Sequence, residues 1–228
     1  MPQSANAPLA VTAPKFFLVS IPIRGTVPLV INRFSQKAKL EMREKQQAGS
    51  TAKSKKTRAP KDFEAMGNEA RHISTEGWDG FSAAAIRQAC VSACRTVGVV
   101  MTKAKLALYA EADGFDQKEG TPLIRIDGTM KMIEHHVRLQ TGVPDLRVRP
   151  HYFPWTSMLR IRFDSDMLTP DDVANLVLRV GLQVGIGEGR PDSKNSCGTG
   201  NGLFVIDGSK EMTLKEVDVS VGDFQWLK

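Results

Sequence analysis

Apolar and polar residues alternate over two stretches of the chain. In residues 15–23 the apolar side chains of Phe17, Val19, Ile21 and Ile23 fall on every second position and share one face, which is the period of a half-buried β-strand. Residues 157–164 repeat this pattern, and their even-numbered members include Arg160 and Arg162. The second stretch therefore predicts a strand with one apolar face and one basic face.

Apolar residues three and four positions apart predict two helices, at 81–98 and 169–181. The first helix carries Cys90 and Cys94 on its apolar stripe. No second pair of Cys or His at ligand spacing accompanies them, so we interpret both as small core residues rather than as half of a metal site. The second helix begins with Thr169 as N-cap, followed by proline and by an acidic residue that completes a capping box.

Further strand-like stretches fill the intervals between these elements: 105–111, 122–128, 130–139 and 202–208. The resulting order of strand, helix, strands, helix and strand is the ferredoxin-like βαββαβ plan, an α+β fold with helices on one face of the sheet. Arg160 and Arg162 should lie on the face that the helices leave free. We expect one such domain at 15–213, a flexible segment at 1–14, and a C-terminal strand or tail at 214–228 that pairs with a neighbour.

A long polar segment, residues 36–76, follows the first strand and should leave the core as a mobile insertion. Nine basic and two acidic side chains lie between 37 and 61, so this excess of +7 exceeds the +6 of the whole chain. Clustered positive charge is typical of a polyanion partner, because each neutralised phosphate releases counterions. The alternative is a solvated loop that binds nothing. The candidate phosphate contacts are Lys53, Lys55, Lys56, Arg58 and Lys61.

The composition narrows the class of protein. A hydrophobic content of 41% in 228 residues is enough for a globular core. The chain has no run of about 18 apolar residues and no signal peptide, which predicts a soluble protein with no membrane partner. Its three cysteines have no disulfide-framework spacing and suit a reducing compartment. We expect a cytoplasmic protein.

A glycine-rich segment, VGIGEGRPDSKNSCGTGNGLFVI, covers residues 184–206. Glycine lets a ligand approach the backbone closely, so the segment is a candidate phosphate cradle with Arg190 and Lys194 as contacts. The helix precedes the glycines and the strand follows them, which is the reverse of the dinucleotide-binding order, and the Walker lysine is missing. We therefore expect no nucleotide cofactor.

Aromatic and basic residues are interleaved in RVRPHYFPW, residues 147–155. Tyr152 and Trp155 are candidate stacking platforms for bases beside positive charge. The alternative is a connection whose rings fill the core and whose prolines stiffen it. The aromatic RNP1 signature of an ordinary RRM is missing from the predicted strands.

The glycine loop lies between the second helix and the last strand of the predicted core. In this position it resembles the glycine-rich loop of the RAMP superfamily of CRISPR-associated proteins. The residues that carry the match are GIG at 185–187 and GTG at 198–200, with Arg190 and Lys194 between them. In the family two Gly-hydrophobic-Gly triplets bracket about five residues, whereas here ten residues separate them and Thr stands at the centre of the second. The Cas7-like backbone proteins look closest in plan.

This resemblance implies a modified RRM-type core from about residue 15 to 208. Its insertion and glycine loop would grip single-stranded RNA, and its copies would polymerise along the strand. The segment GIG-x-x-RP is also similar to uncharacterised phage and prophage proteins, for which single-stranded DNA or RNA from replication, recombination or defence is a better candidate than a guide RNA. We predict a non-catalytic protein of the bacterial cytoplasm, phage-encoded or not, that binds single-stranded RNA or DNA as a homo-oligomer or with neighbouring subunits.

Two alternatives stay open. One is an assembly protein of a phage or multiprotein complex that binds no nucleic acid. The other is a RAMP-type endoribonuclease, because some relatives use a histidine as general base. The four histidines are His72, His135, His136 and His151. His135 and His136 are adjacent on a predicted strand and point to opposite faces, and His72 is expected at the surface, so catalysis is the weaker hypothesis.

Overall fold

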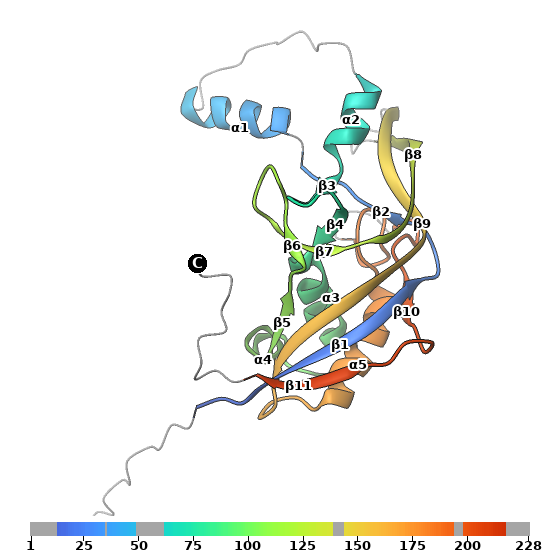
Figure 1. Cartoon of the computed structure of the whole chain (residues 1–228). Helices are drawn as coiled ribbons and strands as arrows, with labels where there is room; N and C mark the ends of the chain where they lie inside the picture. Colours follow the sequence, from blue (N-terminus) through green and yellow to red (C-terminus); the bar gives the residue numbers. More distant parts are fainter. Residues whose placement is uncertain (1–12, 35, 49–61, 139–143, 194–197, 218–228) are drawn as a thin grey trace, which may run out of the picture.

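The protein is described by a computed structural model at residues 13–34, 36–48, 62–138, 144–193 and 198–217. It is a mixed α+β structure with antiparallel sheets (Figure 1). The strands of the larger sheet are β1 (Phe16–Gly25), β2 (Leu29–Val30), β5 (Leu108–Glu111), β8 (Asp127–Arg138), β9 (Pro144–Asp164), β10 (Phe204–Ile206) and β11 (Thr213–Val217). Those of the smaller sheet are β3 (His72–Ile73), β4 (Asp79–Ser82), β6 (Gly114–Phe115) and β7 (Pro122–Arg125).

The helices are α1 (Gln36–Ala48), α2 (Phe63–Glu69), α3 (Ala83–Val97), α4 (Met101–Ala107) and α5 (Pro170–Arg179), and α5 continues into a π-helical turn, η1 (Val180–Val184). Both predicted helices are confirmed as α3 and α5. Thr169 and Asp172 form the predicted capping box, and Gly98 ends α3 in the left-handed conformation. None of the helices in the described residues is long and apolar enough to cross a membrane.

The strands β1 and β9 form the centre of the larger sheet. β10 and β11 pair with β1, and β5 pairs with the edge of β9 that lies away from β1. The helices α3 and α5 lie together on one face of this sheet (Figure 1). The other face is therefore the one that these helices leave uncovered.

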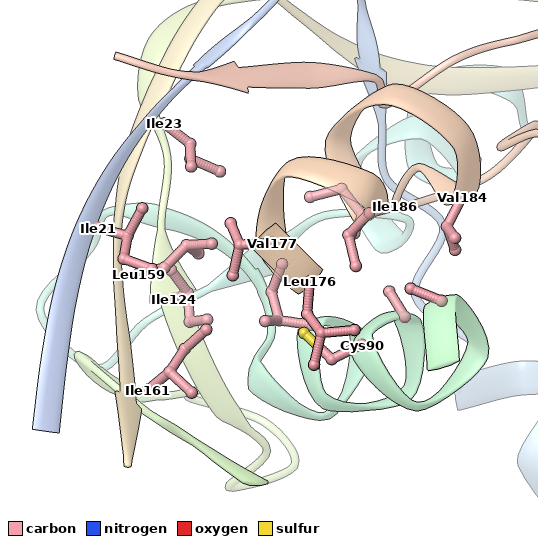
Figure 2. Close-up of a cluster of buried hydrophobic side chains, with 14 of the residues drawn as sticks. Ile21, Ile23, Cys90, Ile124, Leu159, Ile161, Leu176, Val177, Val184 and Ile186 are labelled. Atoms are coloured by element: carbon pink, nitrogen blue, oxygen red, sulfur yellow. The ribbon is translucent and has the colours of Figure 1, made fainter. Parts of the chain in front are cut away.

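The core lies between this sheet and the two helices. Figure 2 shows isoleucine and leucine side chains of β1 and β9 directed at Leu176 and Val177 of α5 and Cys90 of α3. Each fully buried aliphatic side chain contributes about 2 kcal/mol through its removal from water. Burial raises the pKa of Cys90 to about 12, and Cys94 is buried too. The interpretation of both cysteines as core residues is confirmed.

The insertion after the first strand is more ordered than predicted. Residues 36–48 form α1, whose Ala, Leu, Met, Glu, Gln and Lys residues favour helix. Helix α2 packs on β9, where Gly67 lies so close to Val148 that an added Cβ would be 2.9 Å from its side chain. Composition alone suggested an unstructured excursion, because it does not reveal that contact. Two further boundaries differ: residues 101–107 are helical, and 147–155 lie inside β9 rather than in a connection.

The glycine loop lies against β2. All six glycines between 185 and 202 have positive φ. The amides of Glu188 and Gly202 donate to the carbonyls of Val30 and Pro28, each at 2.8 Å. A Cβ at position 202 would be 1.8 Å from the carbonyl oxygen of Ile186. The glycines therefore let this backbone pack closely against itself and the neighbouring strand, a structural role that needs no ligand.

Replacing Gly202 by Ala should be far more destabilising than replacing Gly200 by Ala. Comparing the two variants distinguishes the effect of close packing from that of backbone strain. Both residues have positive φ, of 71° and 84°, but a Cβ at Gly200 meets nothing within 4 Å. We expect a loss of about 1 kcal/mol for Gly200→Ala and more than about 3 kcal/mol for Gly202→Ala. Urea denaturation measures both, and equal losses would contradict the packing role.

Candidate nucleic-acid interface

The uncovered face of the larger sheet carries the basic side of β9. Arg162 lies opposite Leu18 of β1 and Tyr109 of β5, and Arg160 lies opposite Ser20 and Glu111. The odd-numbered residues 159, 161 and 163 are buried, whereas both arginines are partly exposed. The predicted alternation of β9 is therefore confirmed, and it places two guanidinium groups on the face away from α3 and α5.

Arg162 is held by two aromatic rings. Its guanidinium carbon lies 5.3 Å from the centroid of the Phe16 ring and 4.9 Å from that of Tyr109. The two rings meet edge to face with centroids 6.2 Å apart. Such cation–π contacts fix the plane of the guanidinium and thereby orient its donors. Phe16 and Tyr109 were not among the predicted contacts, although the two-residue period of a strand puts Phe16 on the same face as Leu18, the partner of Arg162.

Arg160 is engaged differently. Its guanidinium forms an ion pair with Asp113 at 2.7 Å and donates to the carbonyl of Ala112. Glu111 lies directly opposite on β5. These carboxylates offset much of its charge, so Arg160 is a weaker candidate than Arg162 for binding a phosphate.

Tyr109 also contacts a cation from the helical side of the sheet. The guanidinium carbon of Arg87, on α3, lies 5.1 Å from the Tyr109 ring centroid, so this ring is contacted by both Arg87 and Arg162. Arg87 donates to the carbonyls of Leu108 and Lys105, where α4 meets β5. Edge strand β5 therefore joins the basic side of the sheet to the outer side of α3.

A groove of about 620 Å³ continues from Arg87 between α3, α4 and the glycine loop. Its charged lining consists of Arg87, Arg95, Lys105, Arg190 and Asp192. Arg95 forms an ion pair with Asp192 at 2.7 Å, and Arg190 donates to the carbonyl of Gly187 at 3.1 Å. Four cations and one carboxylate leave the groove positive. We call the series Arg162, Tyr109, Arg87, Lys105 and Arg190 the basic track.

Arg190 and Arg162 thus lie on different sides of the sheet. The two are linked through Tyr109 and Arg87 rather than by direct proximity. Sequence reasoning missed Arg87 and Lys105. The contact of Arg87 with Tyr109 follows from tertiary packing that no local pattern encodes.

The basic residues of 147–155 are engaged inside the protein. Arg149 and Arg147 both form ion pairs with Glu188 of the glycine loop, at 2.7 and 3.7 Å. The ring of His151 stacks on His135, with centroids 4.5 Å apart. Burial, together with the charge of His135, lowers the pKa of His151 to about 4, although Glu188 acts in the opposite direction. At neutral pH His151 is therefore uncharged. The ion pairs of Arg147 and Arg149 with Glu188 connect the β8–β9 hairpin to the glycine loop.

Tyr152 and Trp155 are core residues, with exposed fractions of 2% and 1%. The indole of Trp155 donates to the carbonyl of Val27 at 2.9 Å. Burial raises the pKa of the Tyr152 hydroxyl, which lies beside the Arg71–Asp79 ion pair. Neither ring can stack on a base in this conformation, so the prediction of stacking platforms is corrected in favour of core packing.

Six candidate contacts lie outside the described residues: Lys53, Lys55, Lys56, Arg58, Lys61 and Lys194. They stay predictions. In the helix that leads into the basic segment, Lys39 forms an ion pair with Glu119 at 2.6 Å. Within the described residues, no cluster of His, Cys, Asp or Glu has a geometry suited to a metal ion.

The buried His151 should make stability depend on pH. Its folded-state pKa of about 4 is below the ordinary 6.5, so the unfolded chain takes up a proton that the folded chain does not. The stability is present above pH 6.5 and is lost as the pH falls to about 4, by about 3 kcal/mol for this shift. His151→Phe should remove that component from the unfolding free energy, while the control His136→Gln, at an exposed site, should retain it. A constant difference between parent and His151→Phe from pH 7 to pH 4 would contradict this assignment.

Comparison with known proteins gave a single kind of similarity. No family model matches the chain, and no curated protein does. A solved chain from "Cryo-EM structure of the Type III-B Cmr-beta bound to cognate target RNA" is similar over 90% of this chain, at 11% sequence identity and a TM-score of 0.44. This chain spans 61% of the length of that one. A likeness at this level does not show family membership, so the RAMP relationship stays a prediction.

Proposed function

We propose that this protein binds single-stranded nucleic acid along the basic track and does not cleave it. The observation that carries the proposal is the contact of Tyr109 with both Arg162 and Arg87, at 4.9 and 5.1 Å. It makes two basic surfaces, one on the sheet and one beside the glycine loop, into a continuous path around edge strand β5.

The track offers both kinds of contact that a single strand needs. Arg162, Arg87, Lys105 and Arg190 can neutralise successive phosphates, and Phe16 and the guanidinium planes offer surfaces on which bases stack. A single strand exposes its bases to such surfaces, whereas a duplex buries them in its own stack. The binding should therefore favour single strands with little dependence on sequence.

Finer features of the proposal follow from the topology. The strands β10, β1, β9 and β5 lie side by side in this order, with α3 between β1 and β5 in the chain and α5 between β9 and β10. This is the strand order of the βαββαβ plan, and it supports a ferredoxin-like core of the kind on which the RAMP resemblance rests. We further propose that copies of the protein, or neighbouring subunits, bind side by side along one strand.

The track predicts a defined change in salt dependence. Lys105→Gln and Arg162→Gln should each reduce the slope of log K against log salt by about 0.7, because each loses one phosphate contact with a single strand. The assay is fluorescence anisotropy with oligo(dT) and oligo(U) of equal length. Arg125→Gln is the matched control, since Arg125 is exposed and paired with Asp127 off the track. Unchanged slopes in both track variants would refute the track, and lack of binding by the parent would favour the assembly protein.

The ribonuclease alternative has one specific observation in its favour. The Nδ1 atom of His72 lies 2.9 Å from the Asp116 carboxylate, an arrangement that could orient a general base. Burial alone would raise the pKa of Asp116, but hydrogen bonds from His72 and from the amides of Lys118 and Glu119 outweigh it and lower the pKa. Arg33 is also buried beside this carboxylate. These contacts join β3 to the turn after β6, and we assign the pair a structural role.

The non-catalytic proposal is tested with end-labelled RNA. The parent protein should leave a single-stranded RNA intact during prolonged incubation, and His72→Ala should behave in the same way, because His72 serves packing rather than proton transfer. Gel analysis of the RNA measures this. Cleavage by the parent that His72→Ala abolishes, with folding retained by circular dichroism, would establish the ribonuclease instead.

A further inference from the structure

The helical side of the molecule carries an apolar groove that the proposed function does not use. Its volume is about 800 Å³, and it lies between the end of α3, the loop after β9 and the outer side of α5 and η1. Its apolar lining includes Val97, Val99, Met167, Leu178 and Leu182. Leu182 is 56% exposed, and Val97, Met167 and Leu178 are also exposed. Such a patch is costly to leave in water and is typical of a surface that binds another segment.

This groove extends toward the end of the larger sheet where β11 finishes. A second cavity of about 240 Å³ shares Val99, Met167 and Leu168 with it and is also lined by Asp166. Asp166 follows Asp164, which is the partner of Phe16, and Phe16 in turn pairs with Val217. The last described residue of β11 therefore lies at the same end of the larger sheet as the loop after β9 that lines the groove.

The strand β11 itself has little to hold it in place. It pairs with β1 over Thr213–Val217, but four of its five side chains are exposed and the fifth is only partly buried. Surface hydrogen bonds contribute little net stability, so an edge strand without buried side chains frays. An anchor beyond Val217 would therefore stabilise β11 on the sheet.

Residues 218–228, with the sequence DVSVGDFQWLK, contain the apolar residues for such an anchor. Phe224, Trp226 and Leu227 match the apolar lining of the groove, and Asp223 is complementary to Arg179 on its wall. Eleven extended residues span up to about 36 Å, which exceeds the length of about 22 Å of the α5–η1 segment. A tether this short also favours the chain's own groove over a neighbour's through its effective concentration.

We propose that residues 224–227 of the chain dock into the apolar groove of the same molecule and thereby anchor β11 on the sheet. Docking removes the exposed apolar side chains from water. It also fixes Lys215, on β11, opposite Leu18 on the face that carries Arg162. The inference is independent of nucleic-acid binding, since it concerns the free protein.

Contact quenching of bimane by tryptophan tests the docking. Bimane is attached to Leu182→Cys in a Cys197→Ser background, since Cys90 and Cys94 are buried. Its fluorescence should be quenched and should recover in Trp226→Phe, because the indole lies in the groove. The matched control is Leu106→Cys, which is 67% exposed and lies outside the groove, and its fluorescence should not respond to Trp226→Phe.

A second measurement does not require a label in the groove. In hydrogen exchange, Trp226→Ser should reduce the protection of the amides of 214–217 by about tenfold or more, because β11 loses its anchor. The amides of β1 that face β9 should be unaffected. Two results would overturn the proposal in favour of docking into a second copy. One is quenching that disappears on dilution. The other is quenching of a labelled chain that lacks 218–228 when unlabelled full-length protein is added. Unchanged protection together with no Trp226-dependent quenching would overturn it altogether.

Discussion

The antiparallel pairing of β1 with β9 is the constraint on which the rest of the structure depends. Over Phe16–Arg24 and Thr156–Asp164 the two strands are in continuous register, so side chains at alternate positions share a face. A shift of β9 by one residue would bury Arg160 and Arg162 under α3 and α5 and expose the apolar side chains that β9 now contributes to the core. Burial of that apolar face therefore fixes the position of the exposed cations.

Edge strand β5 connects the cations on the free face of the sheet to those beside α3. A central strand would separate the two faces of the sheet, but at an edge a side chain can be approached from both sides. Tyr109 receives Arg162 from the sheet face and Arg87 from α3. Arg87 is fixed in turn by donating to two backbone carbonyls at the α4–β5 junction. Aromatic rings and backbone carbonyls are thus among the partners that orient these two guanidinium groups.

Local patterns predicted the parts of the structure that local physics determines. The alternation of β9, the capping box at Thr169 and the buried Cys90 all depend on residues near in sequence, and all are confirmed. The helix α2 was missed because its packing partner, β9, lies far along the chain. Tyr152 and Trp155 looked like stacking platforms because interleaved aromatic and basic residues do not reveal which face of β9 is covered. The contact between Arg87 and Tyr109 likewise joins α3 to β5, and nothing in either segment signals it.

The glycine loop connects separate elements of the fold, a role that the prediction of a flexible phosphate cradle did not include. Its positive-φ glycines let it pack against β2, and its two carboxylates bind arginines of separate elements: Glu188 binds Arg149 on the hairpin, and Asp192 binds Arg95 on α3. Residues 188–192 of the loop therefore connect the hairpin to α3, and Arg190 lies between these two ion pairs in the sequence. Under the proposed function, ion pairs on both sides of Arg190 would reduce the conformational entropy that its backbone loses on meeting a phosphate. The loop would then contribute through the position of Arg190 at the groove.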